Sequence, residues 1–132
     1  MHTDILFTHS YYLRFDPKQW ATAQPYPPLG TLYAAALLRA HGYTVSLFDT
    51  MFAHNAHDIQ VTLDQQTPAF FVLYDDGFNY LTKMCLTNMR EAACVMAREA
   101  KANGCTVIIN SSDSTDRYEY YLKNGVDHVV RG

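Results

Sequence analysis

The chain has 132 residues, of which 17% are charged and 48% are hydrophobic, so one globular domain with a buried core is expected and a disordered protein is excluded. Its net charge of −3 and its scattered basic residues give no electrostatic reason to bind nucleic acid or an anionic membrane. The first residues show no targeting pattern, and no apolar run is long enough to span a bilayer. We therefore expect a cytoplasmic location.

Five short apolar segments are predicted to be β-strands. They alternate with helical patterns along the whole chain, which is typical of a parallel sheet covered by helices. Several are apolar at consecutive positions, as expected of strands covered on both faces. The predicted strands are Asp4–Thr8, Tyr43–Phe48, Ala69–Tyr74, Thr106–Asn110 and His128–Val130.

Four helices are predicted between these strands, with start and stop signals at their ends. Proline at a first helical position, asparagine at an N-cap and glycine just after a last turn are the signals used. The predicted helices run from Pro28 to the residue before Gly42, over 55–66, over 79–103 before Gly104, and over 115–124 before Gly125.

Apolar positions spaced three or four residues apart predict which side of each helix packs inward. The stripe of the first helix is Leu29, Leu32, Tyr33, Ala36 and Leu37; that of the third is Leu81, Cys85, Met89, Ala92, Ala93, Met96 and Ala100; that of the fourth is Tyr118, Tyr121 and Leu122. The three cysteines have no close pairs, so Cys85, Cys94 and Cys105 are expected to be small buried hydrophobes.

These elements predict a single α/β domain over residues 1–132. Right-handed crossovers favour a three-layer αβα, flavodoxin-like or Rossmann-like architecture, with a five-stranded parallel sheet in the order 2-1-3-4-5. Ligands of such sheets bind outside the carboxyl ends of the strands, where the strand order reverses. The loops after the first, third and fourth strands are therefore the candidate site.

The first of these loops spans 9–27, far longer than the two to six residues usual in such connections. Its aromatic residues are able to line a groove for a large flat ligand or to contact another domain. The third and fourth loops are short and polar, and their hydroxyls, amides and backbone N–H groups suit amide or phosphate groups. The predicted binding residues are His9, Ser10, Tyr11, Tyr12, Trp20, Tyr74, Asp75, Asp76, Phe78, Asn79, Ser111, Ser112 and Asp113.

Simpler roles remain open for some of these residues. Asn79, Ser114 and Thr115 are equally suited to capping the helices that follow them. Asp75 or Asp76 also fits the phosphoacceptor position of a receiver domain, but the positions directly after the first strand, where such a domain carries the acidic residues that hold magnesium, read Thr8-His9-Ser10. Neither a glycine-rich dinucleotide loop nor a P-loop occurs, and no catalytic nucleophile or metal site is predicted.

Two stretches resemble one known family. Residues 26–49, YPPLGTLYAAALLRAHGYTVSLFD, are similar to the P-P-L-G-x-x-x-L-A-A-x-L-R-x-x-G-x-x-V-x-x-x-D run of cobalamin-binding domains that precede a radical S-adenosylmethionine (radical SAM) barrel. Residues 124–132, NGVDHVVRG, are similar to the family's G-x-D-x-V-V-x-G-E-G-E segment up to its acidic residues. The first match is fairly specific. The second is short, and it supports the resemblance only because it lies at the expected position at the end of the chain.

The resemblance implies a domain that holds cobalamin at the carboxyl ends of the strands and presents it to a radical SAM catalytic domain in cis. That barrel binds S-adenosylmethionine and a 4Fe-4S iron–sulfur cluster through a C-x-x-x-C-x-x-C motif, which is absent here. The chain alone is therefore not expected to be catalytic, whereas its parent would be a methyltransferase or related enzyme. The D-x-H-x-x-G motif that supplies a lower histidine ligand is also missing, since His9 lacks the flanking residues.

One alternative within the same fold is a domain without cofactor that serves as a docking or scaffold module. In that case Tyr11, Tyr12 and Trp20 would face a protein partner.

Overall fold

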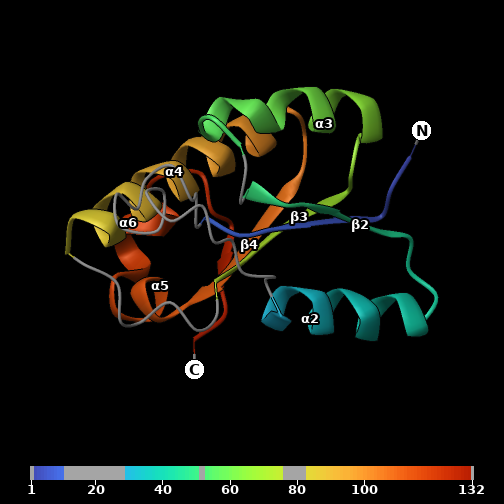
Figure 1. The fold of residues 1–132 in the computed structure, drawn as a ribbon, viewed down its shortest axis with the longest axis horizontal. Helices are drawn as coiled ribbons and strands as arrows, with labels where there is room; N and C mark the ends of the chain where they lie inside the picture. Colours follow the sequence, from blue (N-terminus) through green and yellow to red (C-terminus); the bar gives the residue numbers. More distant parts are fainter. Residues whose placement is uncertain (1, 11–28, 51–52, 76–82, 132) are drawn as a thin grey trace, which may run out of the picture.

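The computed structural model describes residues 2–10, 29–50, 53–75 and 83–131, which form a five-stranded parallel sheet with helices on both faces (Figure 1). The strand order is β2-β1-β3-β4-β5. The predicted three-layer α/β fold and its strand order are therefore confirmed. The strands are β1 (Ile5–Thr8), β2 (Val45–Phe48), β3 (Phe70–Asp75), β4 (Thr106–Ser111) and β5 (His128–Val129).

The direction of the chain through the sheet decides which face each helix covers. The step from β1 to β2 runs one way across the sheet, and the later steps run the other way, so right-handed crossovers put α2 opposite α3 and α4 (Figure 1). None of the helices among the described residues is long and apolar enough to cross a membrane. The helices are α2 (Leu29–Ala40), the 3₁₀ turn η3 (Ala56–Asp58), α3 (Ile59–Gln66), α4 (Lys83–Ala102), α5 (Ser112–Asp116) and α6 (Tyr118–Leu122).

Most predicted helix ends lie close to those observed. Asn55 caps η3 by accepting a hydrogen bond from the backbone N–H of His57, and Asp58 completes a capping box. The helix predicted over 115–124 is instead two short helices, because it begins early, at Ser112, and breaks at Arg117, whose φ of −122° and ψ of 39° are not helical. Residues 79–82, at the predicted start of α4, lie outside the described residues.

The main core lies between the sheet and the α3–α4 layer. Buried residues of α4 pack against Leu6, Phe71 and Val107 from three neighbouring strands. The described part of the predicted α4 stripe is confirmed, and Cys94 and Cys105 are buried free thiols. Leu81 and the side chain of Cys85 lie outside the described residues. The confirmed α4 residues are Met89, Ala92, Ala93, Met96 and Ala100.

The prediction for α2 was wrong for Tyr33 and Leu37, which are 76% and 61% exposed. Leu32 and Ala36 line a groove beside β2 but are not buried, and the side chain of Leu29 lies outside the described residues. Thr31 is buried instead and donates a hydrogen bond to the backbone oxygen of Tyr74 at 2.8 Å. Because apolar residues occur all round this helix, their spacing does not fix its rotation, and the observed rotation places Thr31 against β3.

The sheet is more open on the α2 side than the consecutive apolar residues predicted. Phe71 and Leu73 are buried against the α4 layer, whereas Phe70 is exposed and Val72 is only partly buried. Among the described helices α2 alone covers this face, and it contacts β1, β2 and β3 but lies away from β5. On the other face Tyr121 is buried as predicted, while Leu122 is exposed, contrary to prediction.

Candidate functional site

The carboxyl ends of β1, β3 and β4 meet at one end of the sheet; we call residues 8–10, 74–75 and 110–113 the carboxyl rim. Asp75 is the last residue of β3 and lies beside Ser111 in the register of β3 and β4. The backbone N–H of Ser10 donates to Oδ1 of Asp75 at 2.6 Å, and the Ser10 hydroxyl donates to Oδ2 at 2.5 Å. Two predicted site residues from distant parts of the sequence are thus in direct contact.

The surroundings of Asp75 raise its pKa above the ordinary value for an aspartate. Burial is the largest influence and raises the pKa of Asp75, with a smaller contribution from the negative charge of Asp113. The two hydrogen bonds from Ser10 act in the opposite direction but do not cancel the effect of burial. The protonated form of this carboxyl group is able to donate a hydrogen bond as well as accept one, whereas the ionised form only accepts.

His9 is fully buried and connects the end of β1 to the end of β2. Its Nε2 lies 3.0 Å from Oδ1 of Asp49, and its Nδ1 lies 3.1 Å from the hydroxyl oxygen of Thr50. Thr8 strengthens this connection by donating to the backbone oxygen of Phe48 at 2.7 Å. Both imidazole nitrogens of His9 are therefore engaged by the protein itself, and the side chain is inside the fold rather than at its surface.

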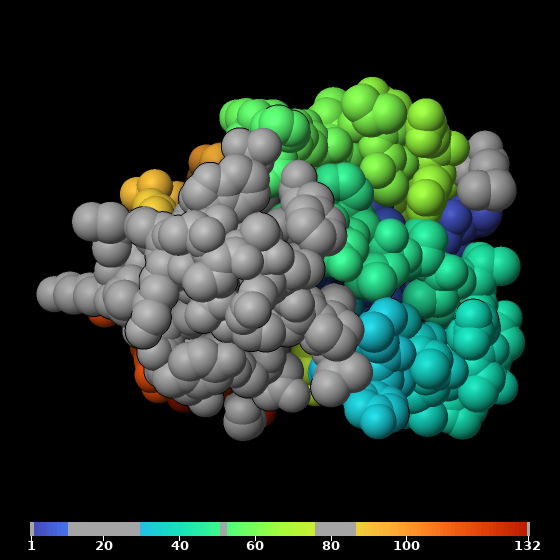
Figure 2. Space-filling model, in the orientation of Figure 1, coloured from blue at the N-terminus to red at the C-terminus, as the bar shows by residue number. Residues whose placement is uncertain are grey.

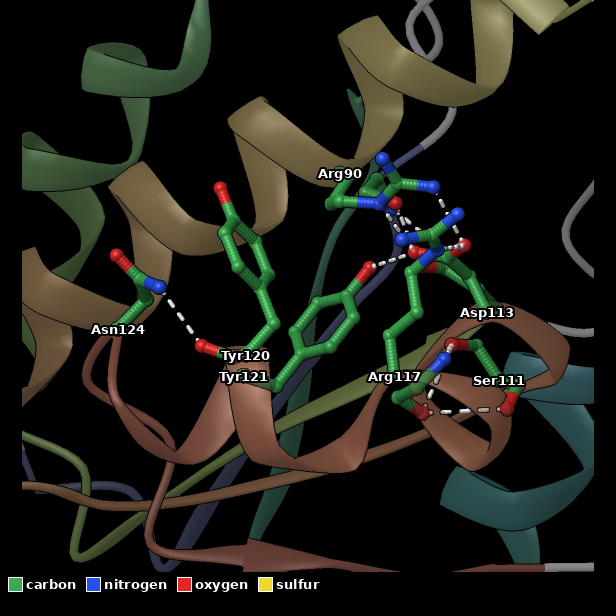
Figure 3. Close-up of polar contacts among 10 residues, drawn as sticks. Arg90, Ser111, Asp113, Arg117, Tyr120, Tyr121 and Asn124 are labelled. Carbon is green, nitrogen blue, oxygen red and sulfur yellow. Dashed lines mark hydrogen bonds and ion pairs between the residues drawn. The ribbon is translucent and has the colours of Figure 1, made fainter.

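Asp113 is held by a cluster of cationic and phenolic groups (Figure 3). Nε and Nη2 of Arg90 each donate to its carboxylate at 2.8 Å, and the Tyr121 hydroxyl donates at 2.6 Å. Arg117 lies farther away, with Nε 3.7 Å from Oδ1. Burial by itself raises the pKa of Asp113, but the hydrogen bonds from Arg90 and Tyr121 outweigh it and leave the pKa below its usual value. This carboxylate joins α4, α5 and α6.

Ser111 is the N-cap of α5. Its hydroxyl oxygen accepts from the backbone N–H of Ser114 at 2.9 Å, and the Thr115 hydroxyl donates to the Ser111 backbone oxygen at 2.9 Å. Capping was expected in this loop, but from Ser114 or Thr115 rather than from a residue predicted to bind ligand. Ser112, in contrast, is exposed at the start of α5.

Both ends of the long first loop are attached to the same strand. Ser10 directly precedes residues 11–28 and bonds to Asp75, while Thr31, in the first turn of the following helix, bonds to Tyr74. The loop therefore leaves and rejoins the described structure beside the last two residues of β3. The predicted site residues Tyr11, Tyr12, Trp20, Asp76, Phe78 and Asn79 lie outside the described residues.

Sequence reasoning missed several residues that shape the rim. Asp49 ends the run that resembles the cobalamin-binding family, so its position at a strand end was visible, but its contact with His9 was not. No sequence signal connects Arg90 with Asp113, because they are 23 positions apart and no motif spans them. Among residues 2–10, 29–50, 53–75 and 83–131, no group of three or more His, Cys, Asp or Glu side chains is arranged to hold a metal ion.

Comparison with known proteins adds little to this geometry. No protein-family model matches the chain, and no curated protein matches it. A solved structure titled "Crystal Structure of TesA" is similar over 92% of this chain and 68% of that one, with a TM-score of 0.45 and 15% sequence identity. At these values the similarity carries no argument about function.

Proposed function

We propose that this chain is a cobalamin-binding domain of the kind associated with a radical SAM barrel, and that it holds the corrinoid over the carboxyl rim. The observation that supports this most directly is the double attachment of the first loop to β3, through Ser10 and Asp75 at one end and Thr31 and Tyr74 at the other. The point of attachment is where the strand order reverses, between β1 and β3.

This attachment supports a binding role because of what the loop contains. Tyr11, Tyr12 and Trp20 belong to the segment between Ser10, which bonds to Asp75, and Thr31, which bonds to Tyr74. Aromatic side chains suit the flat face of a macrocycle, and a loop of this length is far more than a connection from β1 to α2 requires. The proposed ligand surface therefore combines an aromatic loop with a polar rim.

The polar groups of the rim suit the edge of a corrinoid, which carries amide side chains. Ser10 offers a hydroxyl, and Asp75 is a carboxyl group that accepts from the N–H of an amide and, when protonated, also donates to its oxygen. The exposed Ser112 adds a hydroxyl at the end of β4. When bound, cobalamin would supply a cobalt centre that accepts and donates an alkyl group.

The structure of the rim also argues for a particular mode of binding. His9 is fully buried and already bonds to Asp49 and Thr50, so it is not positioned to serve as a lower ligand to cobalt. We therefore expect cobalamin to bind without a protein histidine on the metal. The S-adenosylmethionine and the 4Fe-4S cluster would belong to a separate barrel of the parent enzyme, since this chain has no C-x-x-x-C-x-x-C motif.

Hydroxocobalamin provides the direct test. Mixed with the purified chain, it should elute with the protein on gel filtration and show a shifted visible spectrum. Replacing Trp20 with Ala should reduce the cobalamin retained, whereas the matched Tyr120→Ala, at an exposed ring on α6, should not. An unshifted spectrum with no retention by the unmodified chain would contradict the proposal.

A second candidate is a docking or scaffold domain without cofactor. The observation that favours it is the apolar surface of α2, where Tyr33 and Leu37 point into solvent. For this function, replacing Tyr33 or Leu37 on this surface, or Tyr11, Tyr12 or Trp20 in the first loop, should weaken association with a protein partner while cobalamin binding stays absent throughout. Retention of hydroxocobalamin by the unmodified chain would exclude this candidate.

A further inference from the structure

Apart from its short length of four residues, the edge strand β2 lacks the features that usually keep an exposed sheet edge from pairing. Among the described residues β2 pairs only with β1, so its outer edge presents backbone N–H and C=O groups. Exposed edges are normally protected by charged residues, prolines or bulges. Tyr43–Phe48 contains none of the first two and is rich in residues that favour strands. The β2 edge is therefore suited to pairing with another strand.

A groove runs beside this edge and is mostly apolar. It is lined on one side by α2 and on the other by β2, with a single charged residue, Arg39. Figure 2 shows α2 in cyan and the β2 region in teal side by side on the visible face of the molecule. The lining residues are Leu32, Ala35, Ala36, Arg39, Val45, Ser46 and Leu47.

The charges at the two ends of β2 are opposite in sign. Arg39, exposed near the C-terminal end of α2, lies with Val45 at the start of the strand. Asp49 directly follows the strand, and its side chain is 46% exposed while it bonds to His9. An antiparallel partner strand with the same sequence would bring its own Asp49 to the Arg39 end and its own Arg39 to the Asp49 end. The edge is thus complementary to itself.

We propose that the β2 edge and the adjoining α2 groove bind a second copy of this chain about a twofold axis, through antiparallel pairing of the two β2 strands. The axis would stand perpendicular to the sheet, so the two sheets become continuous and the two α2 helices lie on the same face. Leu32 and Ala36 of each copy would then pack against the other across the axis, and two Arg39–Asp49 ion pairs would form. Such a contact is closed and symmetric.

This interface goes beyond the proposed function and uses a different part of the molecule from the carboxyl rim. Analytical ultracentrifugation of the unmodified 132-residue chain is the first test. At a concentration of about 100 µM the chain should sediment as a dimer, since a dissociation constant of about 1 µM would leave few monomers. A chain that remains monomeric at that concentration overturns the proposal.

Charge reversal tests the predicted pairing geometry. Arg39→Glu and Asp49→Lys should each weaken the dimer at least about tenfold, because each places like charges together, and the double variant should recover most of the affinity. Recovery by the double variant also excludes misfolding as the cause of the single effects. Failure of the double variant to recover, with each single variant weakened, overturns the proposed arrangement.

A matched pair on α2 tests which side of the helix is used. Leu32→Glu should dissociate the dimer, because Leu32 lines the groove beside β2. Leu37→Glu makes the same change five residues along, about 140° round the helix from Leu32, and should leave the dimer intact. Equal dissociation by both variants, or dissociation by Leu37→Glu alone, contradicts the use of this groove.

Discussion

Two aspartates at the ends of neighbouring strands differ in how the protein treats their charge. Asp113, just after β4, receives two hydrogen bonds from Arg90 and one from Tyr121, and its pKa is lowered. Asp75, at the end of β3, receives hydrogen bonds from Ser10, and burial raises its pKa. The surroundings of Asp113 stabilise its charged form, whereas the surroundings of Asp75 make its charged form less favourable than in an exposed aspartate.

This difference separates the framework of the rim from its adaptable part. Exchanging a bidentate arginine partner for a ligand costs a carboxylate two charge-assisted hydrogen bonds and is therefore energetically unfavourable. For a carboxyl group that is held by one serine the energetic cost of binding a ligand is smaller, because the serine hydroxyl is able to rotate toward the ligand. We therefore assign structural support to the Asp113 cluster and ligand contact to the Ser10–Asp75 pair.

The largest expected effect comes from removing the cation beside Asp113. Arg90→Met should lower the free energy of unfolding by about 2–3 kcal/mol, less than for a fully buried pair, because a partly buried carboxylate loses its bidentate partner. Arg117→Met is the control and should cost less than about 0.5 kcal/mol, since Arg117 is 58% exposed and more distant. Urea denaturation measures both, and equal losses would mean that Asp113 is not held mainly by Arg90.

The backbone at Gly125, which follows α6, lies very close to the backbone of α4. Gly125 has a φ of +100°, and a Cβ added there would lie 2.9 Å from the backbone nitrogen of Arg98 in α4. Gly125→Ala should cost about 2–3 kcal/mol, combining backbone strain with overpacking. Gly104→Ala, at a φ of +91° with no atom near the added Cβ, should cost only about 1–2 kcal/mol. A cost for Gly125→Ala no larger than its control, measured by thermal denaturation, would argue against the close approach.

A smaller effect is expected at the N-cap of α5. Ser111→Ala should cost about 1 kcal/mol of stability, because the backbone N–H of Ser114 loses its acceptor. Ser111→Thr keeps an acceptor oxygen and should recover most of that loss. If Ser111→Ala is as stable as the unmodified chain in urea, the cap contributes little.

The smallest change at neutral pH is expected for Asp75→Asn, which keeps the shape of the side chain and removes its charge. We expect a difference within about 1 kcal/mol, because the amide is able to bond to both donor and acceptor groups of Ser10. The informative measurement is stability against pH in the unmodified chain and in this variant.

The two aspartates should affect that pH profile in opposite directions. Because the pKa of Asp75 is raised on folding, its stabilising contribution to the free energy of unfolding is fully present below the pKa of the unfolded state, about 3.9. That contribution is lost as the pH rises through the pKa of the folded state. Because the pKa of Asp113 is lowered on folding, its stabilising contribution to the free energy of unfolding is present above the pKa of the unfolded state, about 3.9. That contribution is lost as the pH falls through the pKa of the folded state. Asp75→Asn should therefore remove a decline with rising pH, and Asp113→Asn a decline with falling pH. Identical profiles of stability against pH for the two variants would contradict the opposite pKa shifts of Asp75 and Asp113.

The fold was predictable from the sequence because its signals are local and repeated. Short strands alternate with helices whose ends carry Asn55, Gly42 and Gly104, and crossover handedness then limits the strand order. The rotation of α2 was not predictable, because apolar residues surround it and their spacing does not indicate that Thr31 lies against β3.

The candidate site was predictable as a place but not as a set of contacts. Strand ends indicated Ser10 and Asp75, which the structure brings together. The same reasoning included His9 and Asp113, whose partners Asp49 and Arg90 come from other elements and carry no motif. Residues at a strand end thus share a position, while their roles depend on side chains that sequence spacing does not connect.

Equilibrium dialysis of hydroxocobalamin against the unmodified chain, Asp75→Ala and Arg117→Met tests the central claim most directly. We expect the unmodified chain to bind, Asp75→Ala, which removes every polar atom of the side chain, to bind about tenfold more weakly, a difference of about 1.4 kcal/mol, and Arg117→Met to bind like the unmodified chain. No binding by the unmodified chain, or a greater loss in Arg117→Met than in Asp75→Ala, would contradict the assignment of the Ser10–Asp75 pair to ligand contact.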